Sequence, residues 1–102
     1  MIQEEIRILL DAPPTGEDAP SLDAIEHTLT AGYARALALE AERWRLERKI
    51  AELVARLGDD ANEQSEIVTL GRRLSAADGD LTRLRGLLSS LRTRAAEVRT
   101  TV

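Results

Sequence analysis

Residues 67–98 read IVTLGRRLSAADGDLTRLRGLLSSLRTRAAEV, and apolar residues recur in this stretch at alternating steps of three and four. This seven-residue repeat places the apolar side chains on one narrow stripe of an α-helix, the a/d stripe of a coiled coil. The stripe consists of Ile67, Leu70, Leu74, Ala77, Leu81, Leu84, Leu88, Leu91, Ala95 and Val98. Because a second helix must cover such a stripe, the sequence predicts an all-α fold.

A matching stripe runs through the preceding part of the chain. It consists of Leu22, Ile25, Leu29, Gly32, Ala36, Leu39, Arg43, Leu46, Ile50, Leu53 and Leu57. Ser21 is a favourable N-cap residue in front of this stripe, and Gly58 supplies a C-terminal stop behind it. The pattern predicts a first long helix over about residues 21–57.

The turn between the two stripes is short. Asp60, followed three residues later by Glu63, resembles a capping box that starts the second helix. We therefore expect a turn at residues 58–60 and a second helix over about 61–99. Two helices of similar length with so short a link predict an antiparallel two-helix coiled-coil hairpin spanning residues 21–102.

Antiparallel packing around this turn also predicts which residues face one another. Small residues then meet large ones, as where Gly32 faces Leu88. The expected apolar pairs include Leu53 with Ile67 and Leu39 with Leu81. The flanking charges agree with this register, since it brings together Lys49 and Glu66, Glu42 and Arg73, Arg35 and Asp80, and Glu26 and Arg92. Exposed pairs of this kind select a register but contribute little to stability.

Residues 1–20 form a separate N-terminal piece in this prediction. An apolar segment up to Leu10 is consistent with either a helical turn or a strand. Asp11 to Pro20 contains three prolines and Gly16, which excludes regular structure and predicts a linker. The apolar segment has three open roles: it covers the end of the bundle, swaps onto a second subunit, or docks on another protein.

Composition limits the class of protein. Leu, Ala, Arg and Glu dominate the 102 residues, which is typical of long helices. Lys49 is the single lysine among 14 basic residues, a bias that fits a GC-rich bacterial genome. The chain has no cysteine, no apolar run of about 20 residues and no basic flank before its first apolar residues. We therefore expect a cytoplasmic bacterial protein without disulfides or a membrane span.

The net charge of −4 is unevenly distributed. Residues 1–34 carry seven acids against Arg7, a charge of −6, whereas residues 81–102 carry five arginines against Glu97, a charge of +4. The predicted hairpin would bring these two ends side by side, so we interpret the basic end as the electrostatic partner of the acidic end. The alternative is an anion or nucleic-acid patch formed by Arg83, Arg85, Arg92, Arg94 and Arg99.

The sides of the helices that face away from the hairpin seam carry a second pattern. Large and small apolar residues follow the outer side of the first helix, and small residues follow that of the second. The predicted dimer or partner interface comprises Tyr33, Ala34, Leu37, Ala41, Trp44, Ala51, Gly79, Thr82, Gly86 and Ser89. Two hairpins that pair these stripes would form a four-helix bundle. The alternative is that the small stripe is plain solvated surface.

No constellation of catalytic residues is evident. His27 is the single histidine, and without cysteine the chain offers no familiar zinc set, so we expect an exposed side chain there. We predict no cofactor, no metal and no enzymatic activity. The expected function is a homodimeric protein–protein interaction module, an adaptor, scaffold or regulator with an unidentified protein partner. The alternative is an anti-sigma-like transcriptional regulator that responds to a ligand or nucleic acid through the arginines.

Overall fold

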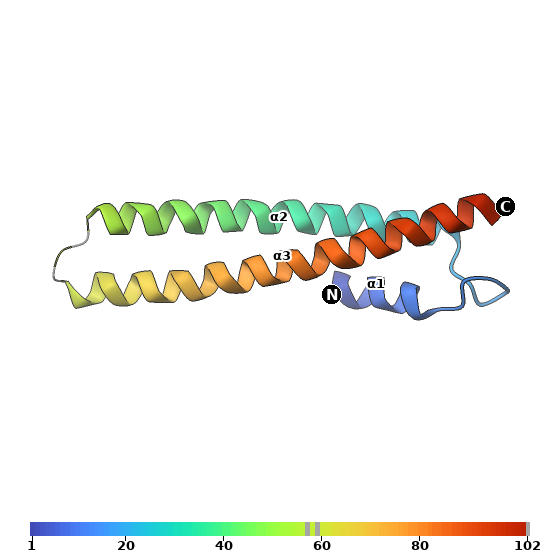
Figure 1. Ribbon diagram of the computed structural model, residues 1–102, viewed down its shortest axis with the longest axis horizontal. Coiled ribbons are helices and arrows are strands. Elements are labelled where there is room, and N and C mark those ends of the chain that lie inside the picture. The colour runs from blue at the N-terminus through green and yellow to red at the C-terminus, as the bar shows by residue number, and fades with distance from the viewer. Residues whose placement is uncertain (57, 59, 102) are drawn as a thin grey trace. The chain divides into compact units, whose positions relative to one another are not determined.

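The computed structural model describes residues 1–56, 58 and 60–101, of which residue 101 is described by its backbone only. The described residues form an all-α fold with helices α1 (Ile2–Asp11), α2 (Leu22–Ala55) and α3 (Ala61–Thr101), as Figure 1 shows. Leu57 and Asp59, which belong to the predicted first helix and turn, lie outside the described residues. The chain divides into unit 1, Met1–Ala36 with Thr82–Val102, and unit 2, Leu37–Leu81.

Both long helices begin at the predicted caps. The backbone N–H of Ala24 donates to Ser21 Oγ at 3.1 Å, which satisfies one of the free donors in the first turn of α2. The backbone N–H of Asn62 donates in the same way to Asp60 Oδ1 at 2.8 Å at the start of α3. The assignment of Ser21 and Asp60 as N-caps is therefore confirmed.

The helix ends differ slightly from the expected ones. α2 ends at Ala55, and the N–H of Arg56 donates to the carbonyl of Leu53 at 3.2 Å, a short-range bond that tightens the last turn. α3 continues to Thr101, two residues past the predicted end at Arg99. No glycine or proline in the last residues interrupts this helix.

Unit 2 contains a segment of α2 packed against a segment of α3. Leu46, Leu53 and Leu70 form its buried core, and Ile50, Ile67 and Leu74 pack against them. An ion pair of 3.0 Å between Arg43 Nη1 and Asp78 Oδ1 spans the two segments. Arg43 is therefore tolerated in the apolar stripe because its guanidinium reaches a carboxylate at the edge of the core.

Unit 1 contains α1, the start of α2 and the last part of α3. Ile6 of α1 is fully buried, together with Leu84 and Leu91 of α3, each at 0% exposure. Gly32 provides the space for this packing, since a Cβ at that position would overlap Leu88 Cδ2 and would lie 3.6 Å from Ile6 Cδ1. The predicted opposition of Gly32 and Leu88 is confirmed.

The apolar N-terminal segment is therefore a helix, and it packs against its own chain. Among the three roles left open by the sequence, the structure shows α1 covering the apolar side of unit 1 through Ile6. Ala12–Ser21 forms the irregular connection to α2, with Gly16 in the left-handed region at φ +95°. Unit 1 therefore includes residues 1–20 together with the start of α2 and the last part of α3.

The C-terminal end of α1 is held by an arginine of α3. Arg94 donates through Nη2 to the carbonyl of Leu10 at 3.3 Å and through Nη1 to that of Ala12 at 3.5 Å. Its Nε also lies 3.6 Å from a carboxylate oxygen of Glu97. Carbonyls at the C-terminal end of a helix carry partial negative charge, so a cation is favourable there.

Removal of this cation should weaken the attachment of α1. We expect Arg94→Met, which keeps the aliphatic length, to lower the free energy of unfolding by about 1 kcal/mol. Arg92→Met is the matched control because Arg92 is exposed on the same helix, and its effect should stay within about 0.5 kcal/mol. Urea denaturation followed by circular dichroism measures both; equal stabilities for the two variants would contradict the role given to Arg94.

Candidate functional site

The outer face of α2 in unit 2 is the most prominent apolar surface among the predicted interface residues. We define the α2 outer face by the exposed residues Leu37, Ala41, Trp44, Arg48, Ala51, Val54 and Ala55. Apart from Val54, which directly precedes Ala55, these residues are spaced by three and four. They therefore lie along one side of the helix, away from the buried residues Leu39, Leu46 and Leu53. Leu37 is 67% exposed, Trp44 57% and Val54 53%.

Trp44 is held in a defined environment on this face. The guanidinium carbon of Arg48, one turn further along α2, lies 4.7 Å from the centroid of the Trp44 ring. This distance is typical of a cation–π contact, which contributes about 0.5–1 kcal/mol at exposed sites. This contact was not predicted from the sequence, although an arginine four residues after a tryptophan on one helix is a spacing that allows it.

The remaining predicted interface residues lie outside the α2 outer face, on other parts of α2 and on α3. Tyr33 and Ala34 of unit 1 are exposed, as are Thr82, Gly86 and Ser89. A Cβ at Gly86 would meet nothing within 4 Å, so no packing among the described residues accounts for a glycine there. Gly79, in unit 2, is half-buried.

Four of the five arginines of the alternative patch make interactions within the chain. Arg94 binds the carbonyls at the end of α1, and Arg99 Nη2 pairs with Glu26 Oε1 at 2.6 Å. Arg83 and Arg85 also make interactions within the chain. Glu26 was predicted to pair with Arg92, but its partner is Arg99. Arg92 lies seven residues, about two helical turns, before Arg99 on the same side of α3.

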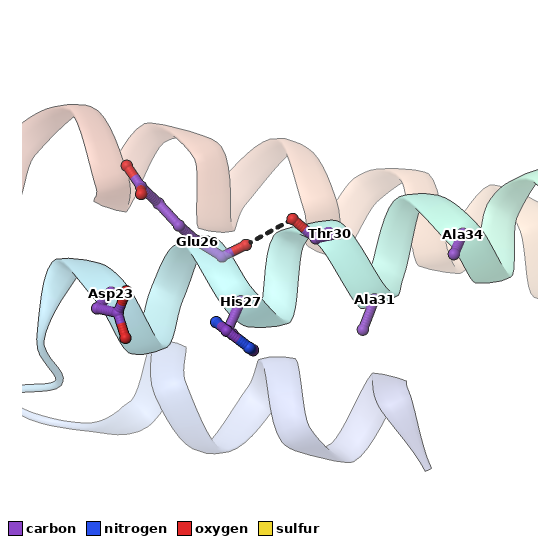
Figure 2. A pocket seen from close by; sticks show the side chains of 6 residues that line it. All are labelled: Asp23, Glu26, His27, Thr30, Ala31 and Ala34. Atoms are coloured by element: carbon purple, nitrogen blue, oxygen red, sulfur yellow. Dashed lines mark hydrogen bonds between the residues drawn. The ribbon is translucent and has the colours of Figure 1, made fainter.

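An open groove of about 460 Å³ lies along the first part of α2 in unit 1, and Figure 2 shows its lining residues. His27 and Ala31 point to the side of α1, whereas Glu26 points toward α3, where Arg99 binds its carboxylate. The Thr30 hydroxyl donates to the carbonyl of Glu26 at 3.1 Å, which is a bond within the helix. His27 is exposed, as predicted.

A second groove, of about 400 Å³, lies in unit 2 between the facing segments of α2 and α3. Its polar rim contains the members of two predicted charge pairs, Lys49 with Glu66 and Glu42 with Arg73. Leu46 and Leu70 contribute its apolar part. The groove mixes both signs of charge, so it offers no strong preference for a cation or an anion.

In the part of the chain that the structure describes, no three or more His, Cys, Asp and Glu side chains are grouped so that they could hold a metal ion. None of the described helices has the length and apolarity needed to span a membrane. The α2 outer face offers contact area, since it exposes an indole, a leucine and alanines on one helix.

Comparison with known proteins gives no further assignment for this surface. No family model matches the chain, and no curated protein or solved structure shows significant similarity to it.

Proposed function

We propose that this chain is a cytoplasmic, non-enzymatic interaction module that homodimerises through the α2 outer face and binds a second protein as an adaptor, scaffold or regulator. The observation that carries the proposal is the exposure of Leu37 and Trp44, 67% and 57%, on one side of one helix. Contiguous exposed apolar residues mark interaction sites, and tryptophan is among the residues that contribute most to binding.

The proposal includes an antiparallel coiled-coil arrangement of α2 and α3. Support comes from burial, because every described member of the two predicted stripes is buried or half-buried. Within unit 2 the ion pair of Arg43 and Asp78 fits the predicted register, and within unit 1 the contact of Gly32 and Leu88 fits it. Two such hairpins would then pair into a four-helix bundle.

A charge placed on the α2 outer face tests the dimer. We expect the unaltered chain to have twice its monomer mass of 11.2 kDa in size-exclusion chromatography with light scattering, and Trp44→Glu to have the monomer mass. The substitution would remove the apolar indole and would require a carboxylate to be desolvated in the dimer, which costs several kcal/mol.

Ala38→Glu is the matched control for this substitution. Ala38 is exposed on the same helix but on its polar side, so the variant adds the same charge away from the α2 outer face. The control should remain dimeric. A monomeric unaltered chain, or a dimer that Trp44→Glu does not weaken, would refute the proposed function.

The arginine-based alternative has less support than the module. Its five members include Arg94 and Arg99, which the fold uses for the carbonyls of α1 and for Glu26. Binding to a DNA duplex at low salt that weakens steeply as salt increases would favour the alternative.

A further inference from the structure

We infer that the α2 outer face is covered by the same face of a second copy, with the two α2 helices antiparallel and the two Trp44 side chains meeting at the two-fold axis. This inference rests on the proposed homodimer and specifies its arrangement. It uses residues of unit 2 alone. Two-fold dimers with the same patch on both subunits are the commonest oligomers of soluble proteins.

The order of charges along α2 is the first argument. Glu40, Trp44 and Arg48 follow one another at four-residue steps, so they lie on consecutive turns of one side of the helix. The guanidinium of Arg48 is held 4.7 Å from the Trp44 ring centroid. An antiparallel copy reverses the order, so that Glu40 of each chain lies across from Arg48 of the other on both sides of the axis. Glu40 is half-buried and also interacts within its own chain, so the contact with Arg48 would add to that interaction. A parallel copy would instead align like charges.

The sizes of the neighbouring residues are the second argument. Leu37 and Ala51 lie seven residues before and seven residues after Trp44, and both are exposed. Antiparallel pairing centred on Trp44 therefore places the large Leu37 side chain of each copy against the small Ala51 of the other. Large residues opposite small ones allow two helices to approach and interdigitate.

This centre also covers the face better than one shifted toward the C-terminal end of the second helix. Sliding the second helix by seven residues toward its C-terminal end would place Trp44 opposite Ala51 and Leu37 opposite Gly58, which lies past the end of α2 at Ala55. Leu37, the most exposed large residue of the face, would then stay in water. The register centred on Trp44 removes both Leu37 and Trp44 from solvent.

Disulfide crosslinking tests this arrangement directly, because the chain has no cysteine of its own. We expect an oxidised mixture of Leu37→Cys and Ala51→Cys chains, distinguished by a tag on one of them, to give a heterodimer band at least about tenfold stronger than either homodimer band. In the inferred register, two Leu37 positions are separated by 14 residues along the helices, about 21 Å, which no disulfide spans. Trp44 is retained in both chains, so the central contact is unchanged.

A second pair of variants tests the competing arrangement, in which the α2 outer face of one copy packs against α3 of the other. Ser75 is exposed on the outer side of α3 in unit 2, in the stripe of small residues that was predicted to cover α2. A preferential crosslink of Leu37→Cys with Ser75→Cys, or a dimer in which Leu37→Cys and Ala51→Cys do not crosslink, would overturn the inference and leave the proposed homodimer in place. A monomer by light scattering would refute both.

Discussion

Replacement of Leu84 by alanine is expected to lower the free energy of unfolding by about 2–5 kcal/mol, because it removes a fully buried side chain and leaves a cavity. Leu84 is 0% exposed and belongs to the core of unit 1, which also contains Leu88 and Leu91 of the same helix. The helix itself would tolerate alanine, since alanine has the highest helix propensity. The loss would therefore report packing between helices.

Urea denaturation at one protein concentration measures this loss, since the proposed dimerisation would make the apparent stability depend on concentration. Val68→Ala is the control, because Val68 is an apolar residue of the same helix that is 53% exposed. Its effect should stay within about 0.5 kcal/mol. A loss below about 1 kcal/mol for Leu84→Ala would contradict the described core.

The second large effect is expected at Gly32, where Gly32→Leu should lower the free energy of unfolding by about 1–3 kcal/mol. Gly32 is buried, and even a Cβ there would overlap Leu88 Cδ2 and approach Ile6 Cδ1 to 3.6 Å. A whole leucine side chain must therefore displace Leu88 or Ile6. Because Ile6 is the buried residue of α1, displacement should also loosen that helix and speed proteolysis in the connection Ala12–Ser21.

Gly71→Leu separates this steric effect from helix propensity. Gly71 lies within α3, and a Cβ at its position would meet nothing within 4 Å. Replacing glycine in an exposed helix interior should stabilise the protein by up to about 1 kcal/mol. Opposite signs for the two variants are the expected result in thermal and urea denaturation. Equal stabilisation by both would show that Gly32 has free space around it.

Much of the fold was predictable from the sequence because the information is local and periodic. A three- and four-residue repeat fixes which side of a helix is apolar, and the described members of both stripes are indeed buried or half-buried. Ser21 and Asp60 were predictable as caps because a capping side chain bonds to a backbone N–H two or three residues away.

The N-terminal segment was less predictable. α1 has ten residues, and helices this short are marginal on their own, so its conformation depends on what it packs against. Ile6 finds its place only because Gly32 leaves room beside Leu88, a contact between residues far apart in the sequence. The role of Arg94 depends on the same docking, since the carbonyls of Leu10 and Ala12 come within its reach only in the folded unit.

The candidate interface was also predictable from the sequence only in part. Spacing alone identified Leu37 and Trp44 as residues of an outer stripe, but only the structure shows how exposed they are and that Arg48 lies against the indole. The sequence also indicated that the acidic and basic ends attract each other, yet only the structure shows that Arg99 and not Arg92 pairs with Glu26.

By itself, therefore, the sequence determined the two long helices, their buried sides and their starting residues. These follow from backbone hydrogen bonding and from the 3.6-residue period, which act over a few residues. Tertiary structure alone decided that α1 is a helix docked over Gly32 and that Arg94 holds its end. Such contacts join distant segments, and their free energy exists only once both segments are in place.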